Sequence, residues 1–421
     1  MSNLNDTASA NRLHIGFFGL RNAGKSSLVN AVTGQELAVV SDVKGTTTDP
    51  VKKAMELLPL GPVVIIDTPG LDDEGELGEK RVTRARRILA QTDLAVLVVD
   101  STVGMQQEDL ELEILFKEKK LPYLIAFNKA DLMKDRVNDA ENHIIAEKTD
   151  SAKKSEENAE NRIYVSSLTG ENVNELKERL GAFAQKLKNE KKLIGDLISP
   201  GDVVVLVIPV DESAPKGRLI LPQQQTMRDI LDNHGIFISC QDTELPQTLE
   251  ALAKPPALVV TDSQAFGRVA KDTPADVMLT SFSILFARYK GSLEPLVRGA
   301  ARLATLKNGD RVLISEGCTH HRQCNDIGTV KIPGWIRAFC KAEPEFAYSS
   351  GGDFPEDLSD YALIVHCGGC MLNEKEMSWR IGKALEAGVP IVNYGIAIAQ
   401  MHGILKRSLE PFPQMLALLE D

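Results

Sequence analysis

Positive charge, aromatic side chains and long apolar runs are all scarce in this sequence. Its 48 Lys and Arg are outnumbered by 59 Asp and Glu, which gives a net charge of −11, and aromatic residues make up 5%. Broad contact with nucleic acid needs clustered basic residues or a basic platform with aromatic side chains, so we expect no nucleic-acid partner. The longest apolar runs, 94–99 and 203–210, are far shorter than the ~20 residues of a membrane-spanning helix, so we expect no membrane partner.

Two further absences bear on location and chemistry. Residues 1–12 lack the cationic start and apolar centre of a secretory signal, which predicts a cytoplasmic protein. Cysteine is also scarce, with six residues in 421. In a reducing cytoplasm, cysteines are more often metal ligands, catalytic groups or core residues than disulfides, so their positions are informative.

What is present is a chain of ordinary globular composition, 43% hydrophobic and 25% charged, whose length predicts two or three domains. In its first part, short apolar runs alternate with amphipathic stretches. This alternation predicts an α/β fold with a mostly parallel sheet and helices on both faces. The expected strands are 13–18, 63–66, 94–99, 123–127 and 163–165, and the expected helices are 25–33, 77–91, 107–119 and 173–187.

Two smaller α/β units are expected to follow. The second unit has predicted strands at 203–210, 236–240 and 257–261 and helices at 225–233 and 245–253. The third has predicted strands at 277–279, 311–315, 346–348, 361–365 and 391–393 and helices at 293–305, 374–387 and 396–405. The highly charged stretch 134–161 is expected to be a solvated excursion. The predicted organisation is a disordered N-terminus at 1–11 and units at 12–190, 195–272 and 273–421.

A phosphate-binding motif follows the first expected strand. Residues 19–26 match G-x-x-x-x-G-K-S between a strand and a helix, where backbone N–H groups can surround phosphates. Lys25 is expected to bridge the β and γ phosphates, Ser26 to ligate Mg²⁺, and Ser27 to reach the α phosphate. Further contacts with the nucleotide are expected from Gly19, Asn22, Ala23 and Gly24.

A second motif is suited to the metal and the γ-phosphate. Asp67 begins Asp-Thr-Pro-Gly at the end of an expected strand, so it can hold Mg²⁺ through water, and the Gly70 N–H can face the γ-phosphate. Upstream, Gly45-Thr-Thr-Thr-Asp supplies hydroxyls for the remaining metal position. We choose Thr47, and a packing or capping role for these threonines stays open.

A third motif selects the base. Asp131, in Asn128-Lys-Ala-Asp, can accept two hydrogen bonds from the N1–H and N2–H₂ groups of guanine, whereas adenine would leave this carboxylate unpaired. The stem of Lys129 can cover the base plane, and the segment from Ser166 can present a backbone N–H to the guanine carbonyl. The ordered motifs therefore predict GTP binding.

These motifs give the first 180 residues a resemblance to the TrmE and Era group of GTPases. Leu71 stands where Ras-like enzymes carry a glutamine that orients the attacking water. Asn22 falls where the resemblance to TrmE implies an asparagine ligand for K⁺, although a local turn hydrogen bond is the alternative. The resemblance implies slow Mg²⁺-dependent GTP hydrolysis that K⁺ stimulates. The residues expected to act in hydrolysis are Asn22, Lys25, Thr47 and Gly70.

Candidate metal ligands follow two expected strands of the third unit. They are Cys318, His320 and His321 after 311–315, and His366, Cys367 and Cys370 after 361–365. The carboxyl ends of parallel strands share one sheet edge, so the two groups can converge. A Cys₃His zinc site, a redox dithiol and an iron–sulfur cluster all remain possible, and we favour the cluster because it uses three cysteines and leaves one position labile. We expect His320 or His366 to be the fourth ligand or to lie beside the cluster, Cys240 and Cys340 to be core residues, and Cys324 to remain undecided.

Across essentially its whole length the chain resembles the HydF family of FeFe-hydrogenase maturation GTPases, on the GTP motifs, C-x-H and H-C-x-x-C. The resemblance implies a GTPase domain, a small α/β dimerisation domain and an α/β domain with a 4Fe-4S cluster on Cys318, Cys367 and Cys370. It also implies a homodimer or tetramer acting as a scaffold. Such a scaffold receives a diiron unit built with radical-SAM maturases and delivers it to apo FeFe-hydrogenase. The alternative is an RNA-modifying or ribosome-associated GTPase with a structural zinc.

Overall fold

The computed structural model describes residues 9–35, 51–68, 87–133, 161–187, 191–210, 219–317 and 326–419. The chain divides into two compact units, 1–189 and 190–421. Several predictions fall outside the described residues: those for 1–8, Thr47, Gly70, Leu71, Cys318, His320, His321 and Cys324, and nearly all of 134–161. Of the expected helix 77–91, residues 87–89 are described and helical.

The first unit is built on a six-stranded sheet in the order β2-β3-β1-β4-β5-β6. All neighbours pair in parallel except β2 and β3, which are antiparallel, so the expected mostly parallel sheet is confirmed. The strands are β1 (Leu13–Phe18), β2 (Val51–Leu57), β3 (Gly61–Asp67), β4 (Leu94–Asp100), β5 (Tyr123–Asn128) and β6 (Arg162–Tyr164).

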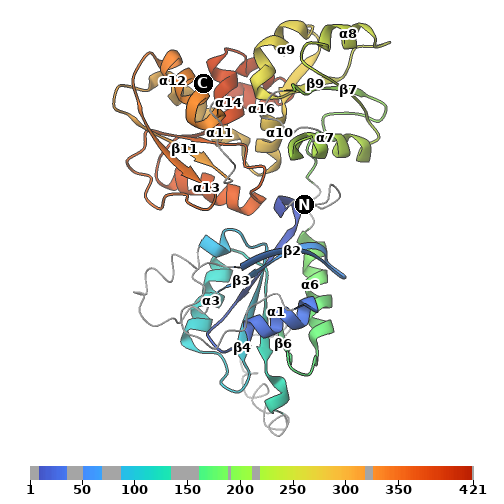
Figure 1. Ribbon diagram of the computed structural model, residues 1–421, viewed down its shortest axis with the longest axis vertical. Helices are drawn as coiled ribbons and strands as arrows, with labels where there is room; N and C mark the ends of the chain where they lie inside the picture. The colour runs from blue at the N-terminus through green and yellow to red at the C-terminus, as the bar shows by residue number, and fades with distance from the viewer. Residues whose placement is uncertain are drawn as a thin grey trace. The chain divides into compact units, whose positions relative to one another are not determined.

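Helices cover both faces of this sheet, as the sequence predicts. Alternate residues of β1 point to opposite faces, so Phe17 packs in one apolar cluster and Phe18 in the other. The Phe17 cluster contains residues of α1 (Lys25–Thr33) and α6 (Val173–Leu187), and the Phe18 cluster contains residues of α3 (Gln107–Glu118). Figure 1 shows α3 on one side of this sheet and α1 and α6 on the other. Two short 3₁₀ turns lie at Ser9–Asn11 and Ala130–Met133.

The second unit contains two four-stranded sheets, both wholly parallel. One has the order β10-β9-β7-β8, with β7 (Val203–Val207), β8 (Ile236–Cys240), β9 (Leu258–Thr261) and β10 (Met278–Ser281). The other has the order β12-β11-β13-β14, with β11 (Arg311–Glu316), β12 (Glu345–Ser350), β13 (Leu363–His366) and β14 (Ile391–Asn393). Numbered within its own sheet, each set of strands lies in the order 2-1-3-4, so the two sheets share one topology.

Strand β10 corrects one expectation. The sequence assigns 277–279 to the third unit, whereas Met278–Ser281 pairs in register with Leu258–Thr261 and completes the first of these two sheets. The remaining elements are α7 (Leu221–Asp232), α8 (Leu245–Glu250), η3 (Ser263–Ala265), α9 (Phe266–Asp272), α10 (Phe282–Tyr289), α11 (Leu293–Ala300), η4 (Ala301–Thr305), the π-helical turn η5 (Ile327–Lys331), α12 (Ile332–Cys340), α13 (Glu374–Glu386), α14 (Tyr394–Met401), α15 (Leu405–Ser408) and α16 (Pro413–Ala417). The expected helix 396–405 is divided because Gly403 has φ 72° between α14 and α15.

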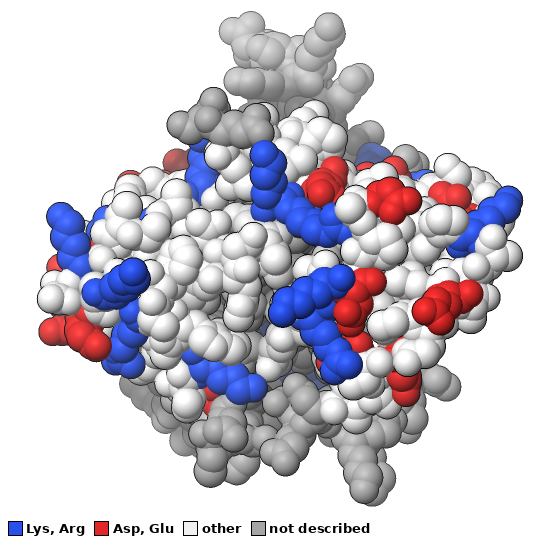
Figure 2. Space-filling model, turned by 90° about the horizontal axis from the view of Figure 1, so that it is seen from above, with Lys and Arg blue, Asp and Glu red and all other residues white. Residues whose placement is uncertain are grey.

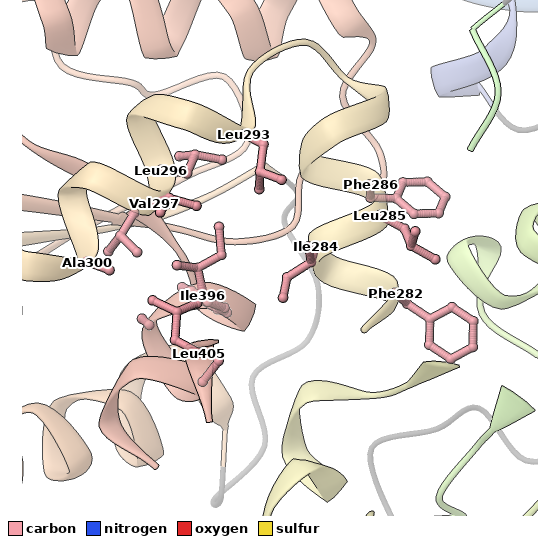
Figure 3. Packing of buried hydrophobic residues seen from close by; sticks show 14 of the residues in the cluster. Phe282, Ile284, Leu285, Phe286, Leu293, Leu296, Val297, Ala300, Ile396 and Leu405 are labelled. Atoms are coloured by element: carbon pink, nitrogen blue, oxygen red, sulfur yellow. The ribbon is translucent and has the colours of Figure 1, made fainter. Parts of the chain in front are cut away.

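One apolar core runs through the second unit and buries helix α10 on two sides (Figure 3). Ile284 points toward the side of α11 and α14, while Phe282 and Phe286 point the other way. All three are at most 2% exposed, and burying each such side chain contributes roughly 1.5–3 kcal/mol. This packing fixes the end of α10, where Lys290 follows.

The surface carries charges of both signs. Figure 2 shows Lys and Arg side chains lying among Asp and Glu. In the second unit, Arg302 pairs with Asp310 at 3.1 Å and Arg337 with Glu343 at 2.9 Å. Such surface ion pairs contribute at most about 1 kcal/mol each. None of the helices in the described ranges combines the length and apolar character needed to cross a bilayer.

Candidate functional site

The phosphate-binding loop between β1 and α1 requires both of its glycines. Gly19 has φ 140° and an added Cβ would lie 2.2 Å from the Val98 carbonyl oxygen. Gly24 has φ 85° and an added Cβ would lie 2.3 Å from Nδ2 of Asn128. Any side chain at these positions would therefore displace a neighbouring strand or the Asn128 amide.

The side chains of this loop are placed for phosphate. Lys25 is 7% exposed, and its Nζ donates to the carbonyl oxygens of Gly19 at 3.0 Å and Leu20 at 2.7 Å. Its ammonium therefore lies within the loop. Asn22 is exposed and has φ 61°, a left-handed conformation that asparagine tolerates better than most residues. Ala23 is buried, and its backbone N–H donates to Leu20 O at 3.4 Å.

Asp67, the last residue of β3, faces the expected magnesium ligand. Its Oδ2 accepts a hydrogen bond from Ser26 Oγ at 3.0 Å, whereas its Oδ1 is buried and has no hydrogen-bond partner among the described residues. Burial raises the pKa of Asp67, and Ser26 and Lys25 oppose that rise. A buried oxygen without a donor is costly unless a ligand satisfies it, so this pair fits Mg²⁺.

The base-recognition segment is connected to the phosphate loop through Asn128. This side chain is fully buried; its Nδ2 donates to Ala23 O at 3.1 Å and its Oδ1 accepts from the Ser167 N–H at 3.0 Å. Ser166 Oγ donates to Asp131 Oδ1 at 2.5 Å and so orients the carboxylate expected to bind guanine. The structure therefore brings these sequence-predicted residues together at one sheet edge.

One detail of base recognition differs from expectation. The backbone N–H of Ser166 donates to Glu171 O at 3.1 Å and that of Ser167 to Asn128, so neither is available to the guanine carbonyl. Leu168 is the third residue of the segment from which this backbone N–H is expected. The hydroxyl group of Ser166 instead contacts Asp131.

Asp100, at the end of β4, was missed from the sequence. Its Oδ2 accepts from Lys129 Nζ at 2.5 Å, and Lys129 has φ 65°. Burial raises the pKa of Asp100, but the hydrogen bonds from Lys129 and Thr102 outweigh it and hold that pKa below its usual value. In the sequence, Asp100 is one acidic residue after an apolar strand. Such a residue is equally typical of a strand end exposed to solvent, so the sequence did not indicate its role.

The cysteine loop, residues 367–372, begins at the carboxyl end of β13. Chain connections leave β11 and β13 in opposite directions, and ligands commonly bind at such a switch point. Cys367 Sγ accepts hydrogen bonds from the N–H groups of Gly317 at 3.0 Å and Gly369 at 3.4 Å. Gly317, which directly precedes Cys318 in the sequence, therefore lies beside the cysteine loop. Two N–H donors on one sulfur fit a ligand of an iron–sulfur cluster.

A buried lysine missed from the sequence contacts this loop. Lys290 is 5% exposed, and its Nζ donates to Leu372 O at 2.7 Å and also to Gly369 O. Burial lowers the pKa of Lys290 to about 8, against the attraction of Cys370, Cys367 and Glu376. The sequence shows only a lysine after an apolar stretch, which is typical of a helix end.

His366 is the last residue of β13 rather than the first residue after it, and it is fully buried. Arg380 Nη1 lies 3.1 Å from Nε2, and a guanidinium can only donate, so Nε2 accepts and Nδ1–H donates to Cys367 O at 2.7 Å. Burial and Arg380 lower the pKa of His366 to about 3. In this arrangement neither ring nitrogen is free to bind iron, and His366 instead orients the Cys367 carbonyl.

Cys370 is the second cysteine of the cysteine loop, and Cys240 and Cys340 lie outside this loop. Cys240 and Cys340 are half-buried and pack against the core of the second unit, as expected. Within the described ranges, no three His, Cys, Asp or Glu residues are arranged to hold a metal ion. Cys318 and His320 lie outside those ranges.

The fold and nucleotide motifs define a P-loop GTPase domain followed by α/β domains. Residues 14–129 match the family model "50S ribosome-binding GTPase". Residues 193–291 match "Hydrogen maturase F dimerization domain" and residues 294–411 match "Hydrogen maturase F tetramerization domain". The two latter models account for nearly all of residues 193–411, and the chain therefore belongs to the hydrogen maturase F family.

The first unit is also similar to other GTPases. The chain is 39% identical over 124 residues to the tRNA modification GTPase MnmE of Desulforamulus reducens, covering 29% of this chain and 26% of that protein. It is 33% identical over 129 residues to GTPase Der of Kosmotoga olearia, covering 30% and 29%. A solved structure of a probable GTP-binding protein engB matches with 24% identity and a TM-score of 0.32, covering 41% of this chain and 99% of that one. The chain thus spans about a quarter of the length of the MnmE relative.

Proposed function

We propose that this chain hydrolyses GTP and carries a 4Fe-4S cluster, and that it assembles the diiron subcluster of FeFe-hydrogenase or transfers it to apo-hydrogenase. Membership of the hydrogen maturase F family supports the role in hydrogenase maturation. The observation that carries the cluster assignment is the position of Cys367, whose sulfur accepts two backbone N–H groups at the switch point beside Gly317. We assign Cys318, Cys367 and Cys370 as the three protein ligands, which leaves a fourth position for His320 or for incoming cargo.

The GTPase reaction follows from residues in the first unit. Lys25 would neutralise charge on the β and γ phosphates of bound GTP. Ser26 and Asp67 would hold Mg²⁺, whose positive charge would stabilise the phosphate oxygens. Asn22 is exposed in the phosphate loop and is proposed to bind K⁺. Thr47 is proposed to supply the remaining Mg²⁺ ligand, and the Gly70 N–H to face the γ-phosphate. Asp131, held by Ser166, selects guanine. The GTPase relatives MnmE and Der support this activity.

In the second unit, the chain's own groups shape the cluster site. A bound cluster would supply an electron-transfer group with one exchangeable iron coordination position. Burial raises the pKa of the Cys367 thiol, and the N–H groups of Gly317 and Gly369 oppose that rise by stabilising a thiolate. Phe354 lies against His366, with ring centroids 6.4 Å apart, and helps to close the site to water.

Assembly and partners are proposed from the family. The matched dimerisation and tetramerisation domains support a homodimer that can pair into a tetramer. Radical-SAM maturases and apo FeFe-hydrogenase are the proposed partners, and we place them in the cytoplasm. The domain boundaries 12–190, 195–272 and 273–421 stay predictions, except that β10 belongs with the sheet of the middle domain.

Anoxic reconstitution with Fe²⁺ and sulfide tests the cluster assignment. We expect about four irons per chain, the content of one 4Fe-4S cluster. Cys318→Ser, Cys367→Ser and Cys370→Ser should each remove most of this iron, while the core substitution Cys340→Ser should leave it unchanged. Full iron retention in all three ligand variants would refute the assignment.

The alternative is an RNA-modifying or ribosome-associated GTPase with a structural zinc, which the names of the MnmE relatives favour. Metal analysis separates the two functions. Stoichiometric zinc that survives purification, together with RNA binding that weakens as salt rises, would support the alternative.

A further inference from the structure

Lys290 places a positive charge inside the second unit, next to the cysteine loop. It follows α10, whose buried apolar side chains hold the end of this helix in place. Its Nζ donates to two loop carbonyl oxygens, those of Gly369 and Leu372, which flank Cys370. This ammonium group therefore connects the loop to the end of α10.

This ammonium lacks a carboxylate partner in the described part of the chain. The acidic side chain that interacts electrostatically with Lys290 is Glu376, and this carboxylate is already paired with Arg380 at 2.7 Å. Another buried acid near Cys367, Glu316, accepts from the Tyr394 hydroxyl at 3.3 Å. The remaining contacts of Lys290 are neutral: two carbonyl oxygens and the Phe286 ring at 5.8 Å.

An uncompensated buried charge is unfavourable unless an opposite charge approaches it. The groups that can supply negative charge here are the sulfurs of Cys367 and Cys370 once they bind a metal cluster. Cluster charge is also a main determinant of iron–sulfur reduction potential.

We propose, on the basis of the cluster assignment above, that Lys290 is a positioning residue for the cluster: it holds the loop around Cys370 and provides the fixed positive charge that balances the anionic cluster. Reduction adds one negative charge, so a nearby cation favours the reduced state. Removing this cation while keeping the volume of its side chain should make the midpoint potential more negative.

The test uses the full chain with Lys290→Met, which removes the charge, and Lys290→Arg, which keeps it. Lys383→Met is the matched control, because Lys383 lies on α13 with its Nζ over the Trp379 ring, at 5.8 Å. Iron per chain is measured after anoxic reconstitution with Fe²⁺ and sulfide, and the midpoint potential by a redox titration followed by electron paramagnetic resonance.

We expect Lys290→Met to lose iron or to shift the reduction equilibrium at least tenfold, which is ~59 mV for one electron. Lys290→Arg should restore most of this loss, and Lys383→Met should match the wild type. Wild-type iron and potential in Lys290→Met would overturn the proposal, as would an Arg variant that fails as completely as the Met variant. If the wild type itself binds no iron, the cluster assignment fails instead.

Discussion

Asp67 and Asp131 are both carboxylates of the nucleotide site, but their neighbours prepare them for different ligands. The buried Oδ1 of Asp67 accepts from no donor in the described ranges, which suits a metal or its water ligand. The Oδ1 of Asp131 already accepts from Ser166, which fixes the plane of the carboxylate. The sequence motif predicts both roles, and only the structure shows how each group is oriented.

Asp131→Asn should weaken GDP binding. The substitution replaces an acceptor for guanine N1–H and N2–H₂ with a group that offers donors of its own. Losing hydrogen bonds to a charged partner costs roughly 3 kcal/mol, or about 100-fold in affinity. The variant should gain relative affinity for xanthosine diphosphate, whose carbonyl replaces the guanine amino group. Fluorescent nucleotide titration measures both, and unchanged GDP affinity would contradict the assigned role.

The K⁺ proposal for Asn22 requires a variant that spares the backbone. Because Asn22 has φ 61°, an alanine there would add strain of about 1–2 kcal/mol that mimics a loss of function. Asn22→Gly removes the amide without this strain, and Asn22→Asp keeps an oxygen ligand. We expect K⁺ to raise wild-type turnover at least ~10-fold over Na⁺, equivalent to roughly 1.4 kcal/mol. Asn22→Gly should abolish the difference and Asn22→Asp should keep part of it; equal wild-type rates in both salts would refute the proposal.

At the scale of elements, two glycines within helices differ in how much space surrounds them next to the sheet that contains β14. A Cβ on Gly299 of α11 would lie 2.0 Å from the Ile391 carbonyl oxygen of β14, whereas one on Gly382 of α13 would meet no atom within 4 Å. Gly299→Ala should therefore destabilise the second unit by about 1–3 kcal/mol. Gly382→Ala should stabilise it by roughly 0.5–1 kcal/mol, because alanine favours the helix.

Tryptophan fluorescence reports this difference selectively. The sequence contains two tryptophans, Trp335 and Trp379, and both lie in the second unit. Thermal unfolding followed through them should give a lower midpoint for Gly299→Ala and a higher midpoint for Gly382→Ala. Equal midpoints would show that α11 can move away from β14.

Two elements, β2 and α10, were missed from the sequence for different physical reasons. β2 was missed because its middle residues, Lys-Lys-Ala-Met-Glu, mix polar and apolar positions on an edge strand. α10 was missed because Val277–Phe286 is an almost continuous apolar stretch, which carries no helical period, and because it divides into β10 and α10 at Ser281. Because α10 was not predicted, the role of Lys290 was not predicted either. That role depends on which loop the end of α10 contacts.

The strands with uniform apolar character were predicted well. β1 matches its expected bounds, and β4 and β5 each extend one residue further. The motifs that follow these strands could be placed correctly because a strand end fixes where the next residues emerge. Contacts such as Asn128 to Ala23 join distant segments and have no local sequence signal.

At the scale of the whole molecule, each unit has its own hydrophobic core. Two apolar clusters cover the faces of the first sheet, and a separate cluster joins the two sheets of the second unit. The shared 2-1-3-4 strand order of those two sheets was invisible as a sequence repeat. Only the later sheet carries cysteines at its switch point, since the equivalent strand end in the earlier sheet continues as Thr261-Asp-Ser.

Separate cores predict that the two proposed activities can be lost independently. Substitutions whose surroundings belong to different hydrophobic cores usually have additive effects. Cys367→Ser should abolish most iron binding while GTP turnover in K⁺ stays within about twofold of wild type, and Ser26→Ala should abolish Mg²⁺-dependent turnover while iron per chain is unchanged. The double variant should show both losses and no further drop in the tryptophan unfolding midpoint beyond that of Cys367→Ser. Iron analysis and phosphate release measure the two activities on one preparation. If Cys367→Ser also stopped GTP turnover, the two sites would be energetically coupled, and the nucleotide would act directly on the cluster.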